Sequence, residues 1–189
     1  MSTPKNIFNL TREYIIKCFN NEAQLRHFDR TVYWLKQFNP TADDYLLVAA
    51  IGHDIERSQR SQEQSMSRVN KGFLDKDDLR EHQQIGAKLL MDFLQKQGCD
   101  KNFIDKVGHV VSSHEIGGDS DQNLLKDADS ISFLENNSAT FLKQIEQLGY
   151  EKIKEKFDWM YNRITSSEAR RIAKPFYEEI IKSLDNASA

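Results

Sequence analysis

The sequence predicts an all-α fold of about eight or nine helices, and three observations carry this prediction. The chain of 189 residues contains only three prolines and eight glycines, whereas an all-β protein needs turn residues roughly every 8–12 positions. Long stretches of helix-forming residues place apolar side chains three and four positions apart. The length fits one domain, so we expect residues 1–189 to fold as a single unit.

Stop and cap signals define the first three helices. Pro4 stands in the first turn of the first helix, where its missing N–H costs nothing. Pro40 ends the second helix, because proline cannot continue it. Thr41 is expected to cap the third, whose apolar centre over residues 46–51 indicates burial on most sides. The ranges predicted for these helices are 2–20, 22–38 and 42–56.

The next segment lacks a helical pattern. Residues 58–76 are polar, rich in Ser, Gln and Arg, and show no clear periodicity. Because a connection of this length is unusual in a compact domain, we expect a lid, a binding loop or a disordered segment.

Caps and glycines divide the second half of the chain. Asp75 can cap a helix that Gly98 ends. Gly117 with Gly118, and later Gly149, separate further helices, and residues 165–168 (TSSE) form a capping box before the last one. The ranges predicted here are 76–97, 101–113, 122–136, 139–148, 150–164 and 166–184.

Composition excludes several classes of protein. Lys plus Arg number 26 and Asp plus Glu 29, a net charge of −3 that argues against nucleic-acid binding. The longest near-apolar stretch, residues 45–52, is too short to cross a bilayer. The first nine residues do not resemble a signal peptide. Cys18 and Cys99 do not suggest a disulfide framework, so we expect a cytoplasmic protein without a membrane partner, of open oligomeric state.

Four of the five histidines lie in register with apolar residues. His82, for example, shares a stripe with Leu79, Leu89 and Phe93 at offsets of three and four. His109 instead aligns with polar residues on the outer side of its helix. The four histidines predicted to face inward are His27, His53, His82 and His114, and Asp54 directly follows the second of them.

One inward histidine is most often a hydrogen-bonded core residue, but four on separate helices favour a shared metal site. Burial of an imidazole or a carboxylate lowers the stability of the fold by roughly several kcal/mol unless the group is paired or bound to metal. Imidazole with carboxylate suits iron, manganese, cobalt or zinc, and magnesium less well.

Three motifs around these residues resemble the HD-domain superfamily of metal-dependent phosphohydrolases. They are residues 27–32 (HFDRTV), 50–57 (AIGHDIER) and 125–131 (LKDADSI). The resemblance covers a core of residues 22–136 and leaves 137–185 as a C-terminal helical extension. It implies an HD-domain-like helical bundle with a metal site in its core.

The resemblance also assigns roles by position. His27, His53, Asp54 and Asp129 match the family's mononuclear metal core, and His82 and His114 match the additional ligands of its dinuclear members. Asp54 would then bridge two divalent ions, with iron or manganese first and cobalt, zinc, nickel or magnesium as alternatives. Helical spacing alone does not separate Asp129 from Asp127, which also falls on an inward stripe.

The implied activity is hydrolysis of a phosphoester or phosphoanhydride through a metal-activated water. Asp54 and Arg57 are the expected catalytic residues, and Arg30 and Arg57 the expected substrate-binding residues. The expected partner is a nucleotide or another small phosphorylated molecule. The absence of a Gly-Tyr-Pro motif disfavours cyclic di-GMP, and Glu56 followed by Arg57 departs from the paired acidic motif of guanosine tetraphosphate hydrolases. Further basic residues at the mouth are Arg60, Arg68 and Lys71.

Some positions and functions stay open. Glu56 is interpreted as a surface carboxylate rather than a general base, Glu115 fits a site role and a surface role equally, and Trp159 is interpreted as core. The same six ligands resemble those of di-iron HD-type oxygenases. A third possibility is a nucleotide-binding module without catalysis.

Overall fold

The computed structural model describes residues 2–187, apart from the side chains of residues 62, 66 and 68–70. This part of the chain contains eleven α-helices, one short 3-10 helix and no strand, which confirms the predicted all-α class. The helices are α1 (Ile7–Cys18), α2 (Glu22–Phe38), α3 (Asp44–Gly52), η1 (Ile55–Gln59), α4 (Gln62–Lys71), α5 (Lys76–Lys96), α6 (Lys101–Val111), α7 (Ser120–Asn136), α8 (Ser138–Leu142), α9 (Ile145–Leu148), α10 (Tyr150–Asn162) and α11 (Ser167–Ala187).

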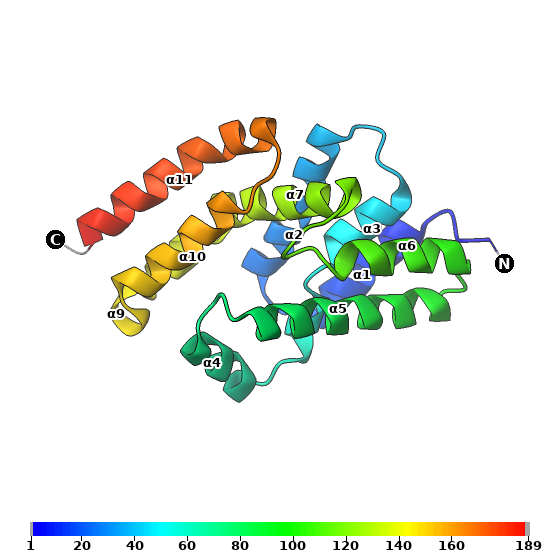
Figure 1. Ribbon diagram of the computed structural model, residues 1–189. Coiled ribbons are helices and arrows are strands. Elements are labelled where there is room, and N and C mark those ends of the chain that lie inside the picture. Colours follow the sequence, from blue (N-terminus) through cyan, green and yellow to red (C-terminus); the bar gives the residue numbers. More distant parts are fainter. Residues whose placement is uncertain (1, 188–189) are drawn as a thin grey trace.

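Two hydrophobic clusters of the described residues meet along α7. One cluster is built from α1, α2, α3, α5 and α6, and includes Leu125 and Ala128 of α7. The other joins Ile131 and Leu134 of α7 to α10 and α11. Figure 1 shows α10 and α11 extending to one side of the molecule, while α1, α3, α5 and α6 lie on the other. Helix α7 therefore connects two halves that each bury their own apolar side chains.

Helix α7 is buried on all sides over residues 125–134. It packs most extensively against α2 and also contacts α3, α6, α10 and α11. A helix enclosed in this way must satisfy every polar side chain it carries. On α7 these polar side chains are Lys126, Asp127, Asp129, Ser130 and Ser132, and each has a hydrogen-bond or ion-pair partner.

The third helix is shorter than the sequence predicts. It starts after Asp43 rather than Thr41, and it ends at Gly52 rather than continuing to residue 56. His53 and Asp54 follow in a turn that leads directly into η1. Because the helix breaks there, two adjacent side chains can face the same interior point.

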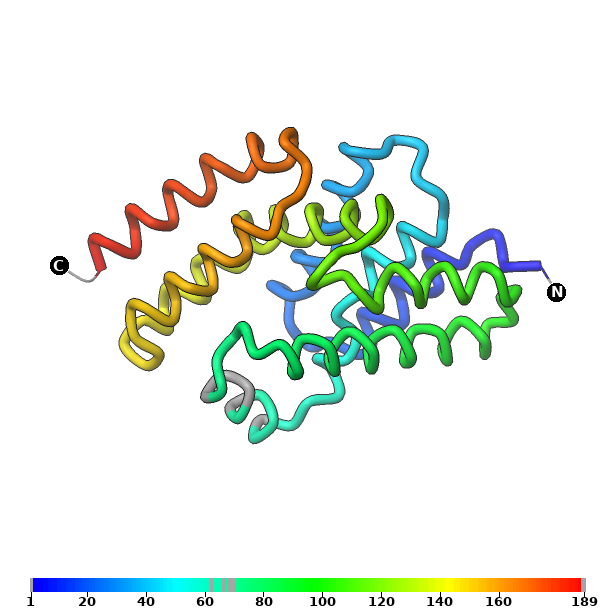
Figure 2. Tube along the Cα trace, in the orientation of Figure 1, coloured from blue at the N-terminus to red at the C-terminus, as the bar shows by residue number. Residues whose placement is uncertain are grey.

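The predicted loop over residues 58–76 contains a helix, which corrects the expectation from the sequence. Figure 2 traces the chain from η1 through α4 to α5. The missed signal is a capping box, in which the Ser61 hydroxyl accepts from the Gln64 amide and the Gln64 side chain accepts from the Ser61 amide. The hydrophobic periodicity is weak because the sequence of α4 contains only two apolar residues, Met66 and Val69.

Other boundaries shift by a few residues. Residues 139–148 form two short helices, α8 and α9, instead of one. Helix α6 ends at Val111, so His114 lies in the turn after the helix. Helix α2 has its predicted limits, with the Asn21 side chain capping the amides of residues 23 and 24. Within the described residues, no helix combines the length and the apolar character needed to span a bilayer.

Candidate metal centre

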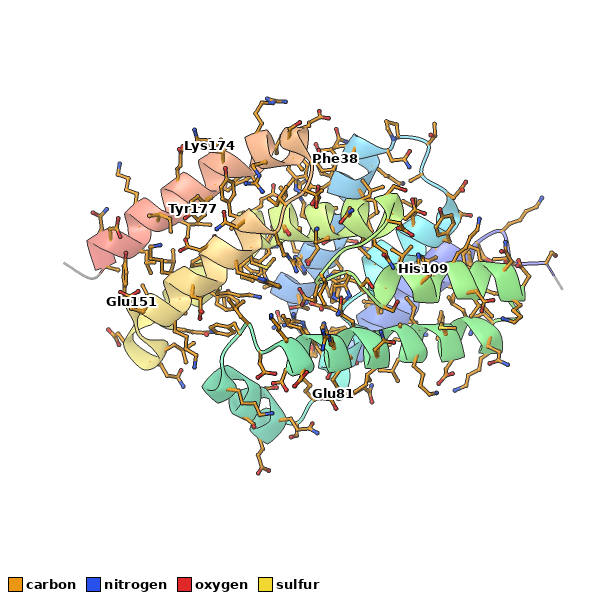
Figure 3. All side chains as sticks on the ribbon, in the orientation of Figure 1. Phe38, Glu81, His109, Glu151, Lys174 and Tyr177 are labelled. Atoms are coloured by element: carbon orange, nitrogen blue, oxygen red, sulfur yellow. The ribbon has the colours of Figure 1, made fainter. Side chains whose placement is uncertain are left out.

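The four histidines predicted to face inward meet in the interior. His27 comes from α2, His53 from the turn after α3, His82 from α5 and His114 from the turn after α6. Their exposed fractions are 2%, 0%, 2% and 0%. Adjacent rings in this group lie 5.1–5.5 Å apart, centroid to centroid. His109, predicted to face outward, is exposed on α6 (Figure 3) and pairs with Asp119.

Three of the four imidazoles use Nδ1 for a hydrogen bond to a carbonyl or hydroxyl oxygen. His53 Nδ1 lies 2.9 Å from the Ala50 carbonyl oxygen, and His114 Nδ1 lies 2.8 Å from the Val111 carbonyl oxygen. His27 Nδ1 lies 2.9 Å from the Ser132 hydroxyl, which itself donates to the His27 carbonyl. Because each partner accepts, Nδ1 carries a hydrogen, and Nε2 is the nitrogen that is directed inward. A protein carbonyl or hydroxyl behind the ring is the usual support of a metal-binding histidine.

His82 is held between two carboxylates. Its Nδ1 lies 2.6 Å from Glu56 Oε2, and its Nε2 lies 2.8 Å from Asp54 Oδ1. Glu56 also pairs with Arg60 at 2.6 Å and is buried, which corrects its interpretation as a surface carboxylate. Glu56 therefore orients His82 from the side that faces away from Asp54.

The Nε2 atoms of the histidines converge on Asp54 and Asp129. Asp129 Oδ1 lies 3.1 Å from His27 Nε2 and 3.4 Å from His53 Nε2. Asp54 Oδ1 lies 3.7 Å from His114 Nε2, and Asp54 Oδ2 lies 3.8 Å from His53 Nε2. The two oxygens of Asp54 thus face different histidines.

The buried ligand atoms fall into two groups that share Asp54. One group contains His27, His53 and Asp54, and the other contains Asp54, His82, His114 and Glu115. Within each group one ligand atom per residue lies within 4.8 Å of the others, so each group could hold a metal ion. Glu115, which the sequence left open, is a buried member of the second group.

Two unpaired nitrogen atoms indicate that this set fits a metal. His53 Nε2 and His114 Nε2 are fully buried and have no hydrogen-bond partner. A buried polar atom without a partner costs about 1–3 kcal/mol. Both atoms point toward carboxylates, and a cation that displaces any proton from these nitrogens would satisfy nitrogen and oxygen together.

Arginines balance the buried carboxylates. Burial by itself raises the pKa of the Asp54 carboxyl, but Arg57 and His53 hold it well below its usual value. Arg57 Nε lies 2.6 Å from Asp54 Oδ2. Arg163 pairs with both Glu115 and Asp129, and it offsets burial to lower the pKa of Glu115 to about 2. The pKa of His53 rises to about 9 against the effect of its burial, because Asp54 and Asp129 lie nearby.

The structure distinguishes the two neighbouring aspartates of α7. Asp129 Oδ1 faces His27 and His53, while its Oδ2 accepts from Arg163. Asp127 faces the other way, and its two oxygens accept from the backbone amides of Thr165 and Ser166, each at 2.7 Å. Asp127 therefore holds the start of α11, and Asp129 alone of the two joins the histidines.

A cavity of about 340 Å³ opens onto the cluster. Its lining includes Asp54, Asp129 and His82, together with Arg57 and Arg60 from the predicted basic set. Arg30 and Lys71 are not among the described lining residues. Arg30 makes two 2.8 Å hydrogen bonds to Glu135, and Lys71 pairs with Asp78. The Arg68 side chain lies outside the described residues.

Sequence reasoning missed the C-terminal contribution to the site. Arg163, which follows α10, and Lys156, which lies on it, both line the cavity. Trp159, interpreted as core, is partly exposed and lies beneath both cations. Lys156, Trp159 and Arg163 recur at offsets of three and four, a pattern that marks one helix face but gives no sign of what that face contacts.

Comparison with known proteins gives one match. A family model described as "Domain of unknown function (DUF4202)" matches residues 13–180. No curated protein and no solved structure matches the chain. The resemblance to the HD-domain superfamily stays a prediction.

Proposed function

The chain belongs to the DUF4202 family, a domain of unknown function, and we propose that it is a metal-dependent phosphohydrolase. The proposed substrate is a nucleotide or another small phosphorylated molecule. The proposed cofactor is a pair of divalent ions, iron or manganese first, bound by His27, His53, Asp54, His82, His114 and Asp129. The HD-domain resemblance of the sequence supports the same assignment.

The observation that carries this proposal is the orientation of the imidazoles. The Nδ1 atoms of His27, His53 and His114 are committed to protein acceptors. Their Nε2 atoms, two of them without a partner, point at carboxylates. A purely structural histidine cluster would be expected to pair these nitrogens, because burying them unpaired lowers stability.

The chain supplies binding and orientation at this centre. When bound, divalent ions lower the pKa of water and withdraw charge from phosphoryl oxygens. Asp54 presents one oxygen to each of two histidine groups, and this arrangement suits a bridging carboxylate. Arg163 fixes the second oxygen of Asp129, which leaves Oδ1 directed at His27 and His53.

The cationic lining of the cavity favours an anionic substrate. Arg57 and Arg60 both line it, and an arginine cannot ligate a cation. Both arginines pair with carboxylates here, Arg57 with Asp54 and Arg60 with Glu56. When Asp54 binds metal, Arg57 is expected to turn its donors toward substrate phosphoryl oxygens.

Metal analysis of three variants tests the centre. We expect the wild-type protein, purified without chelators, to contain two ions per chain. Asp54→Asn should lose both ions, and His82→Asn should lose one, because His82 belongs to only one of the two groups. His109→Asn, an exposed control, should keep both. Full metal content in the Asp54→Asn protein would contradict the proposal.

A substrate panel tests the reaction class. Nucleotides and other phosphate esters should be hydrolysed with Mn²⁺, Fe²⁺ or Co²⁺ and equally well without oxygen. The same ligand set also suits a di-iron oxygenase. If the panel stays intact while oxygen is consumed with an organic substrate, the oxygenase replaces the hydrolase. If metal binds but neither reaction occurs, the result favours the third possibility, a nucleotide-binding module without catalysis.

Arg57→Ala tests the proposed phosphate contact. The variant should keep its metal and its fold, and kcat/KM should fall roughly tenfold to several hundredfold, because a charge-assisted hydrogen bond contributes about 1.5–3 kcal/mol. Arg171→Ala, on the exposed side of α11, is the matched control. An unchanged kcat/KM would mean that Arg57 serves only to pair with Asp54.

A further inference from the structure

Helices α7 and α10 form two walls of the cavity and run in opposite directions. Figure 1 shows them side by side, and Thr165 contacts Asp127, Arg163 contacts Ser130, and Lys156 contacts Phe133. Residue numbers therefore increase along α7 in the direction in which they decrease along α10. Residues that line the cavity from these two helices can be assigned to successive layers.

The layers extend from the candidate metal centre at Asp129 to the polar side chain of Asn137 at the other end of the cavity. On α7 and the turn after it, Asp129, Phe133 and Asn137 line the cavity at intervals of four. They span about 12 Å along the helix axis at roughly 1.5 Å per residue. Arg163 lies level with Asp129, and Lys156 lies level with Phe133. Lys156 is therefore one layer beyond the candidate metal ligands.

The ammonium group of Lys156 lies over three aromatic rings, those of Trp159, Phe133 and Phe73. Its Nζ is 4.5 Å from the ring centroid of Trp159, 5.2 Å from that of Phe133 and 6.0 Å from that of Phe73. These rings attract a cation through their faces. They supply no carboxylate, so these contacts hold the positive charge of Lys156 in place without forming an ion pair with it.

Lys156 differs from the other described cations of the cavity in having no paired anion. Arg57 binds Asp54, Arg60 binds Glu56, and Arg163 binds both Glu115 and Asp129. Lys156 makes no hydrogen bond or ion pair, although only 7% of it is exposed. Burial accordingly lowers the pKa of Lys156 to about 8. The carboxylates of Glu115 and Asp129 raise this pKa without forming an ion pair with Lys156. The ammonium group lines the cavity, so an anionic group that enters the cavity could pair with it.

We propose that Lys156 binds a second anionic group of the substrate, one layer beyond the phosphoryl group held at the metal centre. This inference rests on the proposed function and narrows the substrate to a small molecule with two anionic groups joined by a short spacer. The second group would be a phosphate or a carboxylate, which offer the same anionic oxygens. The cavity volume of about 340 Å³ lies at the small end of the range for ligand pockets, which favours such a compact molecule.

Binding of non-hydrolysable probes tests this proposal. The probes are methylenediphosphonate, which carries two phosphoryl groups, phosphonoacetate, which carries one phosphoryl and one carboxylate group, and methylphosphonate, which carries one phosphoryl group. Calorimetry measures each with the full chain, both Mn²⁺-loaded and metal-free. Lys156→Met removes the charge and keeps the apolar stem, Lys156→Arg keeps the charge, and Lys174→Met is the exposed control on α11 (Figure 3).

The expected result is a selective loss of affinity. Lys156→Met should weaken methylenediphosphonate binding about tenfold to 100-fold, as for loss of one charge-assisted hydrogen bond, and change methylphosphonate binding less than threefold, roughly. Lys156→Arg should retain most of the affinity, and Lys174→Met all of it. An equal loss with phosphonoacetate would show that a carboxylate serves as the second group, and no loss would restrict that group to phosphate.

Thermal stability separates this role from a structural one. Lys156→Met should unfold at a higher temperature than the wild-type protein, because it removes a largely buried charge that has no ion-pair partner. A lower unfolding temperature together with unchanged probe affinity would make Lys156 a structural residue and overturn the proposal. So would equal affinity of the wild-type and Lys156→Met proteins for methylenediphosphonate, or no binding by the wild-type protein at millimolar concentration.

The metal-free measurements keep this test independent of the proposed function. If the protein binds no metal, the hydrolase proposal fails, yet the effect of Lys156→Met on methylenediphosphonate affinity can still be measured. If metal binds and the Lys156→Met effect is absent in both forms, only the inference about Lys156 fails.

Discussion

At the scale of single residues, the two ends of a side chain in the centre have different roles. His53 and His114 bond a backbone carbonyl through Nδ1 and leave Nε2 directed inward. Asp129 offers one oxygen to the histidines and the other to Arg163. This division fixes the orientation of a ligand before any ion is bound, which is the usual role of the residues behind a metal site.

Arg163 is expected to stabilise the metal-free protein. Arg163→Met leaves Glu115 and Asp129 buried without their counter-ion, so the free energy of unfolding should fall by about 3–5 kcal/mol. Urea denaturation in the presence of a chelator measures this change. Arg171→Met, on the exposed side of α11, should stay within about 0.5 kcal/mol of the wild-type protein. Equal losses for the two variants would contradict the prediction.

At the scale of elements, the ends of helices position the site. The chain turns at the end of α3 so that His53 and Asp54 both face inward, and it turns after α6 so that His114 and Glu115 do the same. The Gln83 side chain accepts from the Glu115 amide at 2.9 Å and holds that second turn. Side chains at such breaks can converge in ways that a continuous helix does not allow.

The two aspartates of α7 should separate stability from metal binding. Asp127→Asn weakens the acceptor for the amides of Thr165 and Ser166, so it should lower the free energy of unfolding by about 1–2 kcal/mol and leave metal content unchanged. Asp129→Asn should instead reduce metal content. Denaturation curves and metal analysis of both variants provide the comparison. If Asp127→Asn loses metal and Asp129→Asn keeps it, Asp127 rather than Asp129 is the metal ligand.

The capping box of α4 should control the local stability of that helix. Ser61→Ala removes the acceptor for the Gln64 amide and should cost α4 about 0.5–2 kcal/mol. Hydrogen exchange of the α4 amides should therefore accelerate, while exchange in α7 stays unchanged. Ser65→Ala, which removes only a side-chain bond to the Ser61 carbonyl, is the control. Uniform acceleration across the protein would point to global destabilisation instead.

At the scale of the whole molecule, the centre lies where the two hydrophobic clusters meet. Ligands from α2, α5 and the turns after α3 and α6 approach α7 from one side, and Arg163 reaches it from the other. Holding several charged groups at this junction costs stability that a bound cation would return. Metal binding is thus expected to strengthen the contact between both halves.

Removal of metal should lower the unfolding temperature of the whole chain. A ligand at 1,000 times its Kd stabilises the native state by about 4 kcal/mol, which corresponds to roughly 8–16 °C for a protein of this size. Thermal unfolding with Mn²⁺ and with excess chelator measures the difference. Asp54→Asn should unfold at the same temperature in both conditions. A wild-type protein insensitive to the chelator would contradict the prediction.

The sequence by itself determined the helical class, most helix limits and the inward register of His27, His53, His82 and His114. These features are local, because helical periodicity and caps depend on residues three or four apart. Local periodicity does not predict α4, because its capping box precedes a segment with only two apolar residues. The same local pattern predicts that His109 faces outward, and its side chain is exposed.

Only the tertiary structure decided which polar groups meet across the fold. Asp127 and Asp129 are equivalent by helical spacing, and their separation depends on contacts with residues more than thirty positions away. Arg30 stands near His27 in the chain, yet Glu135 draws it away from the cavity. Arg163 and Lys156 join the site because α10 packs back along α7. Long-range packing sets such partners, and a pattern of neighbouring residues does not record it.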